Sequence, residues 1–185
     1  AVWNSRIPRA ITAQSPATCA VLIKLSPSIR FPARQRFRRG FTARAGIISE
    51  TFETAITWDE FDAFHENVLT ETQAAVESVC GKGIVMWRFT HIYPDGPTIY
   101  YTVVAPGRRG EEISQWDAIK EKASETIIKH GGPITHHHAV GRVHRPWYEK
   151  SRPALYGPVL SNIKKTLDPK WILNPEVLID MDSDT

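Results

Sequence analysis

The most regular hydrophobic pattern in the chain covers residues 61–79, where apolar side chains recur at intervals of three or four. This spacing places them on one face of an α-helix. Just before it, Thr57 and Glu60 fit a capping box, with Thr57 as N-cap and Glu60 at the third helical position, and Gly81 supplies a stop. The residues predicted to face the core are Phe61, Phe64, Val68, Ala75, Val76 and Val79. We therefore expect a helix that ends near Gly81.

A second helical pattern runs from Glu112 to Lys129 and ends at the two glycines that follow it. Its predicted core residues are Ile113, Trp116, Ile119, Ala123 and Ile127. A further helical stretch is expected from about Ala154 to Leu167. Beyond it, Pro169 and Pro175 predict an irregular tail, because proline cannot continue a helix or a central strand.

Three segments have the composition or alternation of β-strands. Residues 47–56 are rich in β-branched and aromatic side chains, and residues 84–93 and 98–104 flank a turn signal at 94–96, so residues 84–104 read as a hairpin. Alternation in its first strand predicts Ile84, Met86, Arg88 and Thr90 on one face and Val85, Trp87, Phe89 and His91 on the other. The order strand, helix, hairpin, helix predicts an α+β fold, with an antiparallel sheet covered by helices on one face.

Charge divides the chain into two parts. Residues 1–49 hold nine Arg or Lys and no Asp or Glu, whereas the rest holds 14 basic and 20 acidic residues. The basic start has the composition of a transit peptide or a nucleic-acid-binding arm, but it lacks an initiating Met and a pattern of stacking aromatics. We therefore predict a poorly specified basic segment over 1–45, with a short strand possible only at 20–23, a folded domain over 46–185, and no nucleic-acid partner.

Two further features bear on the compartment. No stretch approaches the roughly 20 apolar residues of a membrane span. The two cysteines, Cys19 and Cys80, lack the spacing of a metal site, a redox motif or a disulfide framework. Both features predict a soluble, cytoplasmic protein with free thiols.

Candidate chemistry gathers in two places. His136, His137 and His138 are adjacent, and three imidazoles side by side can bind an anion, share a proton or hold a metal. The alternative is a solvated polar loop; a tag remnant is disfavoured because the run is internal and flanked by glycines. In the hairpin, the polar or amphipathic residues Arg88, His91, Tyr100 and Tyr101 suggest a pocket wall, although a tyrosine in a strand is more often a half-buried packing residue.

Four motifs in sequence order carry a family resemblance. They are Glu50-Thr51-Phe52-Glu53-Thr54-Ala55 before Trp58, Gly96-Pro97-Thr98-Ile99-Tyr100, His136-His137-His138-Ala139-Val140-Gly141, and Asp168-Pro169 with Leu173-Asn174-Pro175. Over roughly residues 45–180 the chain resembles the C-terminal part of the alkyldihydroxyacetonephosphate synthases (alkylglycerone-phosphate synthases). These are FAD flavoproteins of the vanillyl-alcohol-oxidase type.

The resemblance implies an FAD-dependent enzyme of ether lipid synthesis. It would exchange the acyl chain of acyl-dihydroxyacetone phosphate for a fatty alcohol, without net oxidation. Tyr100 matches the family's active-site tyrosine, which handles the proton next to the ketone, and His136, His137 and His138 match its essential histidines. Arg39 stands at the family's phosphate-binding arginine, although its neighbours depart from the motif.

Further site assignments follow from these motifs. Arg88 and His91 are expected to bind substrate, His137, His138 and Asn174 are expected to contact FAD, and no metal is expected. The family's FAD-binding domain has no counterpart here, since no glycine cluster precedes residue 46. The chain is therefore expected to be a fragment that carries the substrate side and is inactive alone. For the full-length protein the resemblance implies a homodimer, peripheral membrane contact and, in a eukaryote, a peroxisomal location.

Two other classes of protein remain open. One is an FAD-dependent 2-hydroxy-acid dehydrogenase or oxidase in which His91 and His137 approach a divalent ion; the apparent lack of a carboxylate ligand argues against it. The other is a non-catalytic module whose histidines only bind anions or metal. Binding of FAD would separate this module from the two enzymes.

Overall fold

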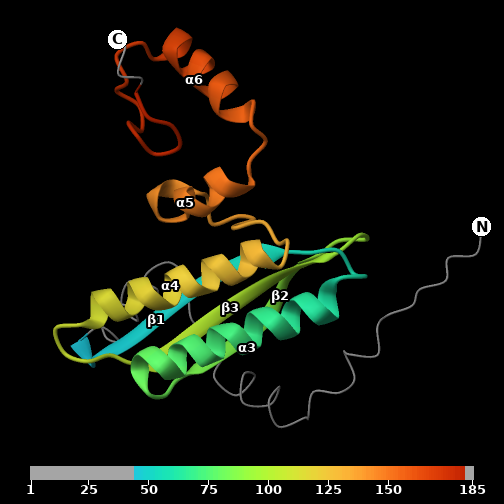
Figure 1. The fold of residues 1–185 in the computed structure, drawn as a ribbon, viewed down its shortest axis with the longest axis vertical. Helices are drawn as coiled ribbons and strands as arrows, with labels where there is room; N and C mark the ends of the chain where they lie inside the picture. The colour runs from blue at the N-terminus through green and yellow to red at the C-terminus, as the bar shows by residue number, and fades with distance from the viewer. Residues whose placement is uncertain (1–43, 182–185) are drawn as a thin grey trace, which may run out of the picture. The chain divides into compact units, whose positions relative to one another are not determined.

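The computed structural model describes residues 44–181 and is built around a three-stranded antiparallel sheet (Figure 1). The strand order is β1 (Ile47–Ala55), β3 (Pro97–Pro106) and β2 (Ile84–Ile92), so the last strand in sequence is central. β2 and β3 form the hairpin expected from the sequence, and β1 pairs with β3 along its whole length. This confirms the predicted antiparallel sheet.

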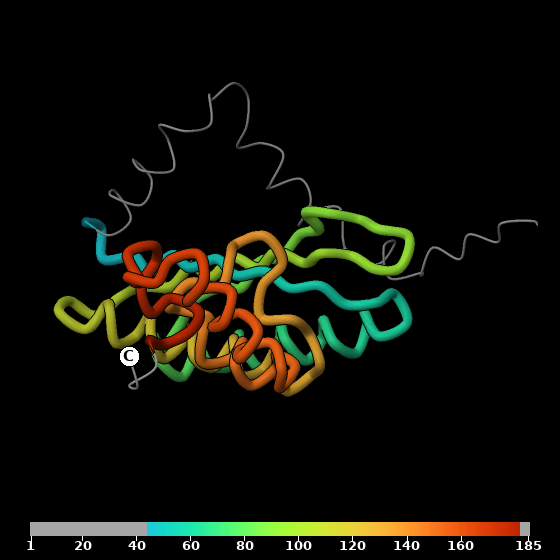
Figure 2. The backbone as a smooth tube through the Cα atoms, turned by 90° about the horizontal axis from the view of Figure 1, so that it is seen from above, coloured from blue at the N-terminus to red at the C-terminus, as the bar shows by residue number. Residues whose placement is uncertain are grey.

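Two helices cover one face of the sheet. α3 (Phe61–Cys80) and α4 (Glu112–Lys129) lie side by side on the same side of the strands, a layering that is also visible from above in Figure 2. The buried core between the layers contains Phe52, Val68, Val76, Ile99, Tyr101, Val103, Ile119 and Ile127 among others. Alternate residues of β3, such as Tyr100 and Thr102, point to the opposite face and are only half-buried. The α+β fold with one helix-covered face is thus confirmed.

The start of α3 differs from the prediction. Glu60 is the N-cap residue and makes no side-chain capping hydrogen bond, while the Thr57 hydroxyl lies 3.4 Å from Glu60 Oε2. Residues 57–60 form a turn because Trp58 is held by the hairpin: its backbone N–H donates to Asp95 O at 3.0 Å and its indole N–H to Tyr93 O at 3.0 Å. The capping-box prediction was wrong, whereas the stop at Gly81, with φ of 77°, is confirmed.

α4 has the predicted span but a different inner face. Ile119, Ala123 and Ile127 are buried as expected, yet Ile113 is 78% exposed. Gln115 takes the inner position instead, because its amide satisfies backbone groups that an isoleucine could not: it donates to Val79 O at 3.0 Å and accepts from Arg108 N–H at 2.6 Å. A polar side chain therefore closes this end of the core.

Two helices follow the histidine run. α6 (Tyr156–Leu167) agrees with the predicted stretch, but α5 (Gly141–Ser151) was not predicted; it begins at a glycine and contains Pro146. None of the helices in the described part combines the length and hydrophobicity of a bilayer-spanning segment. Cys80 is a free, half-buried thiol. Arg39, Cys19 and the possible strand at 20–23 lie outside the described residues.

Candidate functional site

The histidine run is anchored by a buried carboxylate that the sequence did not single out. Glu53 lies in β1 and is 1% exposed. Its Oε1 oxygen accepts the backbone N–H of His136 at 3.0 Å, that of His138 at 2.7 Å, and that of His137 between them. One carboxylate oxygen thus fixes the backbone of all three histidines.

Burial alone would raise the pKa of Glu53, but the backbone N–H groups of His137, His138 and His136 outweigh it and lower the pKa. Glu53 is therefore ionised at neutral pH. Its second oxygen, Oε2, is buried and faces the imidazoles of the run. The nearest nitrogens are Nδ1 of His137, which is in contact with it, and Nδ1 of His136 at 3.9 Å. Burial lowers the pKa of His138, although the charge of Glu53 opposes this.

The chain enters the run through a tight passage after α4. The Thr54 hydroxyl donates to Pro133 O at 2.7 Å, which ties the incoming backbone to β1. A Cβ on Gly132 would lie 2.5 Å from Cζ of Phe64 and 2.8 Å from the Thr54 hydroxyl oxygen, so only glycine fits there. The backbone is thus held against the sheet directly before the histidines.

The exit from the run is also fixed. Ala139 has a left-handed backbone with φ of 65°, which is uncommon for a residue with a Cβ. Nδ1 of the buried His144, in the first turns of α5, lies 2.9 Å from Ala139 O. This hydrogen bond holds the turn that directs the chain from the histidines into α5.

Tyr100 and Arg88 lie beside the run, in one cross-strand row with Glu53. The sheet register pairs Glu53 with Tyr100 and Arg88 with Tyr100. The Arg88 guanidinium carbon is 4.8 Å from the centre of the Tyr100 ring, and that ring lies 5.1 Å from the His138 ring. The structure therefore brings together the predicted phenol, cation and imidazoles.

His91 joins the same face, contrary to the alternation predicted for its strand. The register shifts between Phe89 and His91, which indicates a β-bulge at Thr90. The extra residue returns His91 to the side of Arg88, and its ring lies 5.2 Å from that of His136 and 5.4 Å from that of His137. The prediction that His91 faces with Val85, Trp87 and Phe89 was wrong for this reason.

Tyr101 takes no part in this cluster. It faces the helices, is 0% exposed and hydrogen-bonds through its hydroxyl to Nδ1 of His65 at 2.9 Å. Burial raises the pKa of Tyr101 and lowers that of His65 to about 4. The interpretation of this strand tyrosine as a packing residue is confirmed.

Asn174 lies in the irregular segment after α6, with a left-handed backbone (φ 46°). Within residues 44–181, no recorded contact joins its side chain to the histidine run, so its contact with FAD stays a prediction. The assignment of Arg39 to the phosphate also stays a prediction, because Arg39 lies outside the described residues.

Two sets of side chains at this site have the composition of a metal centre. In each set the candidate ligand atoms lie within 4.8 Å of one another: His91, His136 and His137 in one, and Glu53, His137 and His138 in the other. The sequence argument that no carboxylate is available to a metal therefore does not hold, because Glu53 is brought to the histidines from 83 to 85 residues away.

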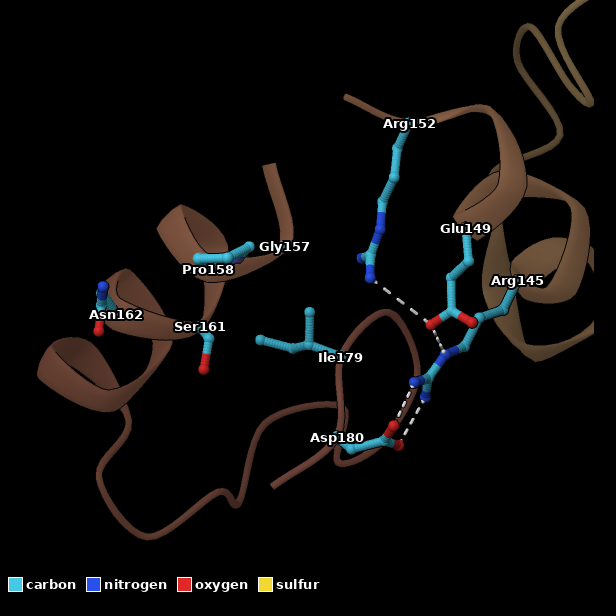
Figure 3. A pocket seen from close by; sticks show the side chains of 9 residues that line it. All are labelled: Arg145, Glu149, Arg152, Gly157, Pro158, Ser161, Asn162, Ile179 and Asp180. Carbon is cyan, nitrogen blue, oxygen red and sulfur yellow. Dashed lines mark hydrogen bonds and ion pairs between the residues drawn. The ribbon is translucent and has the colours of Figure 1, made fainter. Parts of the chain in front are cut away.

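A separate cavity of about 460 Å³ lies between α5, α6 and the tail (Figure 3). Two arginines line this cavity. Arg145 forms ion pairs with Asp180 at 2.6 Å and with Glu149 at 2.8 Å, and Arg152 lies 3.8 Å from Glu149. These pairs raise the pKa of Arg145 and lower that of Asp180. The two arginines and two carboxylates of the cavity wall balance each other in charge, so the cavity presents no excess charge to a ligand. The ion pair between Arg145 and Asp180 also holds the tail to α5.

Comparison with known proteins places these features in context. The sequence pattern of the family described as "FAD linked oxidases, C-terminal domain" matches residues 28–178, and thus begins inside the segment predicted to be poorly specified. The alkyldihydroxyacetonephosphate synthase of Caenorhabditis elegans is 32% identical over 141 residues, covering 74% of this chain and 23% of that protein. The enzyme of the same name from Dictyostelium discoideum is 31% identical over 110 residues, covering 58% and 18%.

A solved structure of an alkyldihydroxyacetonephosphate synthase has the same fold. It superposes with a TM-score of 0.54 at 18% identity, covering 75% of this chain and 22% of that structure. The chain spans about a quarter or less of the length of these relatives.

Proposed function

The chain belongs to the FAD-linked oxidases, in the C-terminal domain of that family, and from this premise we propose that it forms the substrate side of the active site of an alkyldihydroxyacetonephosphate synthase. The reaction is the exchange of the acyl chain of acyl-dihydroxyacetone phosphate for a fatty alcohol, a step of ether lipid synthesis. FAD is the cofactor of this family, and when bound it supplies the redox-active ring on which the chemistry depends.

The observation that carries the proposal is the convergence of Tyr100, Arg88, His91 and the histidine run on one face of the sheet. This is the face opposite α3 and α4, and Tyr100 is only half-buried on it. Arrays of aromatic, cationic and imidazole side chains on a half-open surface fit a planar, partly anionic ring and a phosphorylated substrate. The shared name of the relatives from Caenorhabditis and Dictyostelium supports the same reading.

Tyr100 is the residue that moves a proton in this proposal. As the phenolate, Tyr100 takes the proton from the carbon next to the substrate ketone and becomes the phenol, and it later returns this proton to carbon. The Arg88 guanidinium lies over the Tyr100 ring, 4.8 Å from the ring centre, and its positive charge favours the phenolate form that acts as the base. The imidazole of His138, 5.1 Å from the same ring, limits the orientations open to it.

His91, His136 and His137 bind and orient the substrate's anionic group. Their rings lie within 5.2 to 5.8 Å of one another, which makes a continuous imidazole surface. Tyr93 extends it, since its hydroxyl lies 3.2 Å from Nε2 of His136. Arg39 is proposed as the further phosphate ligand from the motif alone.

The test uses a hybrid enzyme in which this chain replaces the matching C-terminal region of the Caenorhabditis synthase. Tyr100→Phe removes only the hydroxyl, so FAD binding should persist while turnover falls by about 10²- to 10⁴-fold, the usual worth of general acid-base catalysis. Tyr156→Phe is the matched control, because Tyr156 is an exposed tyrosine on α6. A Tyr100→Phe hybrid that turns over at the rate of the Tyr156→Phe hybrid would remove Tyr100 from the mechanism.

A second candidate is a flavin-dependent dehydrogenase of 2-hydroxy acids. The carboxylate of Glu53 favours it, because it stands beside His137 and His138 where a metal-assisted dehydrogenase needs an acidic ligand. Reduction of an artificial electron acceptor by a 2-hydroxy acid separates the two functions, since the synthase reaction transfers no electrons to an acceptor.

A further inference from the structure

The turn that follows the histidine run is strained. Ala139 has a left-handed backbone with φ of 65°, and this conformation is disfavoured for a residue with a Cβ. Such a conformation persists only where the surrounding structure holds it, and it is often found at functional sites. A contact that holds Ala139 in place is therefore required.

The buried side chain of His144 supplies this contact. His144 is 7% exposed, and its Nδ1 lies 2.9 Å from Ala139 O. Because a carbonyl oxygen only accepts hydrogen bonds, Nδ1 carries the proton of this one. Burial lowers the pKa of His144, so the ring is neutral at neutral pH and keeps its single proton on Nδ1. His144 is thus a fixed donor that reaches back five residues to the strained turn.

His138 is held on both sides as a result. Its backbone N–H donates to Glu53 Oε1 at 2.7 Å, and the residue after it is held by His144. Between these hydrogen bonds, the His138 ring lies 5.1 Å from the Tyr100 ring at an interplanar angle of 89°. This edge-to-face contact depends on the direction of the imidazole. Relaxation of Ala139 to a negative φ requires compensating rotations of the His138 backbone, and these would turn its ring relative to the phenol.

We propose that His144 is a positioning residue for Tyr100, because it holds the turn at Ala139 and so keeps the His138 ring against the phenol. This inference rests on the proposed function, in which Tyr100 moves the proton and His138 limits the orientations of its ring. His144 lies in α5 and acts through the backbone of Ala139.

The first measurement uses the purified chain and needs neither flavin nor turnover. Nuclear Overhauser cross-peaks between the ring protons of His138 and Tyr100 report the contact of the two rings. His144→Leu keeps an apolar side chain in the buried position but removes the donor, so these cross-peaks should be lost. His144→Asn should retain them, because its side-chain amide nitrogen takes the place of Nδ1 and can donate to Ala139 O.

The second measurement is the turnover of the hybrid enzyme. His144→Leu should lower kcat by about 10- to 100-fold, since a misplacement of about 1 Å can cost about 10²-fold. KM should change little, because Glu53 still holds the N–H groups of His136 and His137. His144→Asn should recover most of the kcat. In an Ala139→Gly background the same Leu substitution should cost less, since glycine adopts a positive φ without support, and this background replaces the first if His144→Leu does not fold.

His65→Leu is the matched control, since His65 also hydrogen-bonds through Nδ1 at 2.9 Å, but to Tyr101 on the helix-covered face. It should leave the cross-peaks between His138 and Tyr100 in place. The proposal is overturned if His144→Leu keeps these cross-peaks, if His144→Asn behaves like His144→Leu, if the control loses them as well, or if kcat is unchanged although they are lost. Failure of the proposed function appears separately in Tyr100→Phe, which leaves the hydrogen bond of His144 intact.

Discussion

Replacing Glu53 by Ala should destabilise the fold by about 3 kcal/mol. The substitution leaves three backbone N–H groups without their acceptor, and hydrogen bonds to a charged group are worth about 1.5–3 kcal/mol each. Two effects reduce the sum: water can reach the partly exposed histidine run, and the desolvation of the carboxylate is relieved. The net effect remains destabilising because the pKa of Glu53 is lowered, so its hydrogen bonds outweigh its burial. Glu53→Gln keeps one acceptor oxygen and should cost about 1–2 kcal/mol.

Urea unfolding of the purified chain, followed by circular dichroism, measures this difference. Glu66→Ala on the exposed side of α3 is the control and should change the stability by no more than about 0.5 kcal/mol. Hydrogen exchange gives a local readout, since the amides of residues 136–138 should lose protection in Glu53→Ala while those of α3 keep it. A Glu53→Ala chain with the unfolding midpoint of the Glu66→Ala control would refute the anchoring role.

Two further predictions concern the packing of the helices. The hydrogen bonds from His130 and Lys129 lower the pKa of Glu71 to about 2, from an ordinary value of 4.5. Because the pKa of Glu71 is lower in the folded state, its ionised form stabilises the fold above about pH 4.5, and this stabilisation is lost as the pH falls towards 2. The melting temperature of Glu71→Gln should therefore depend less on pH between 4.5 and 2. A variant with the same pH profile as the unmodified chain would contradict this role of Glu71. Gly132→Ala should destabilise the fold by about 1–3 kcal/mol, since its Cβ would lie 2.5 Å from Phe64 Cζ, and an unshifted urea midpoint would contradict that packing argument.

The helices and strands were largely predictable because their hydrophobic periods are local. The span of α3 follows from apolar residues spaced three or four apart, and its end from a glycine in a left-handed conformation. Its start was not predictable, because Trp58 is held by the hairpin turn, 35 residues further along the chain. Gln115 lies at the inner face of α4 in place of Ile113 for a similar reason, since it donates a hydrogen bond to the carbonyl of Val79, 36 residues away in the sequence.

The site was predictable in part. A hairpin with its turn at residues 94–96 brings Arg88 opposite Tyr100, and the structure has this pair in register. The face of His91 was not predictable, because a bulge adds one residue to the strand and reverses the alternation beyond it. A one-residue irregularity leaves no mark in a hydrophobic pattern, yet here it decides whether His91 faces the core or the histidine run.

The side of the sheet that Glu53 faces could be predicted from strand alternation, but its burial could not. Glu50 and Glu53 are an odd number of positions apart in one strand, so they must point to opposite faces of the sheet. Once helices are predicted on one face, one of the two carboxylates has to face them, and Glu50 does so, meeting Lys120 at 2.8 Å. That much follows from alternation. The burial of Glu53 does not, because its carboxylate is covered by a loop more than 80 residues away in the sequence. The same backbone groups that bury the carboxylate also orient the three histidines, so the burial of Glu53 and the geometry of the site have a single cause.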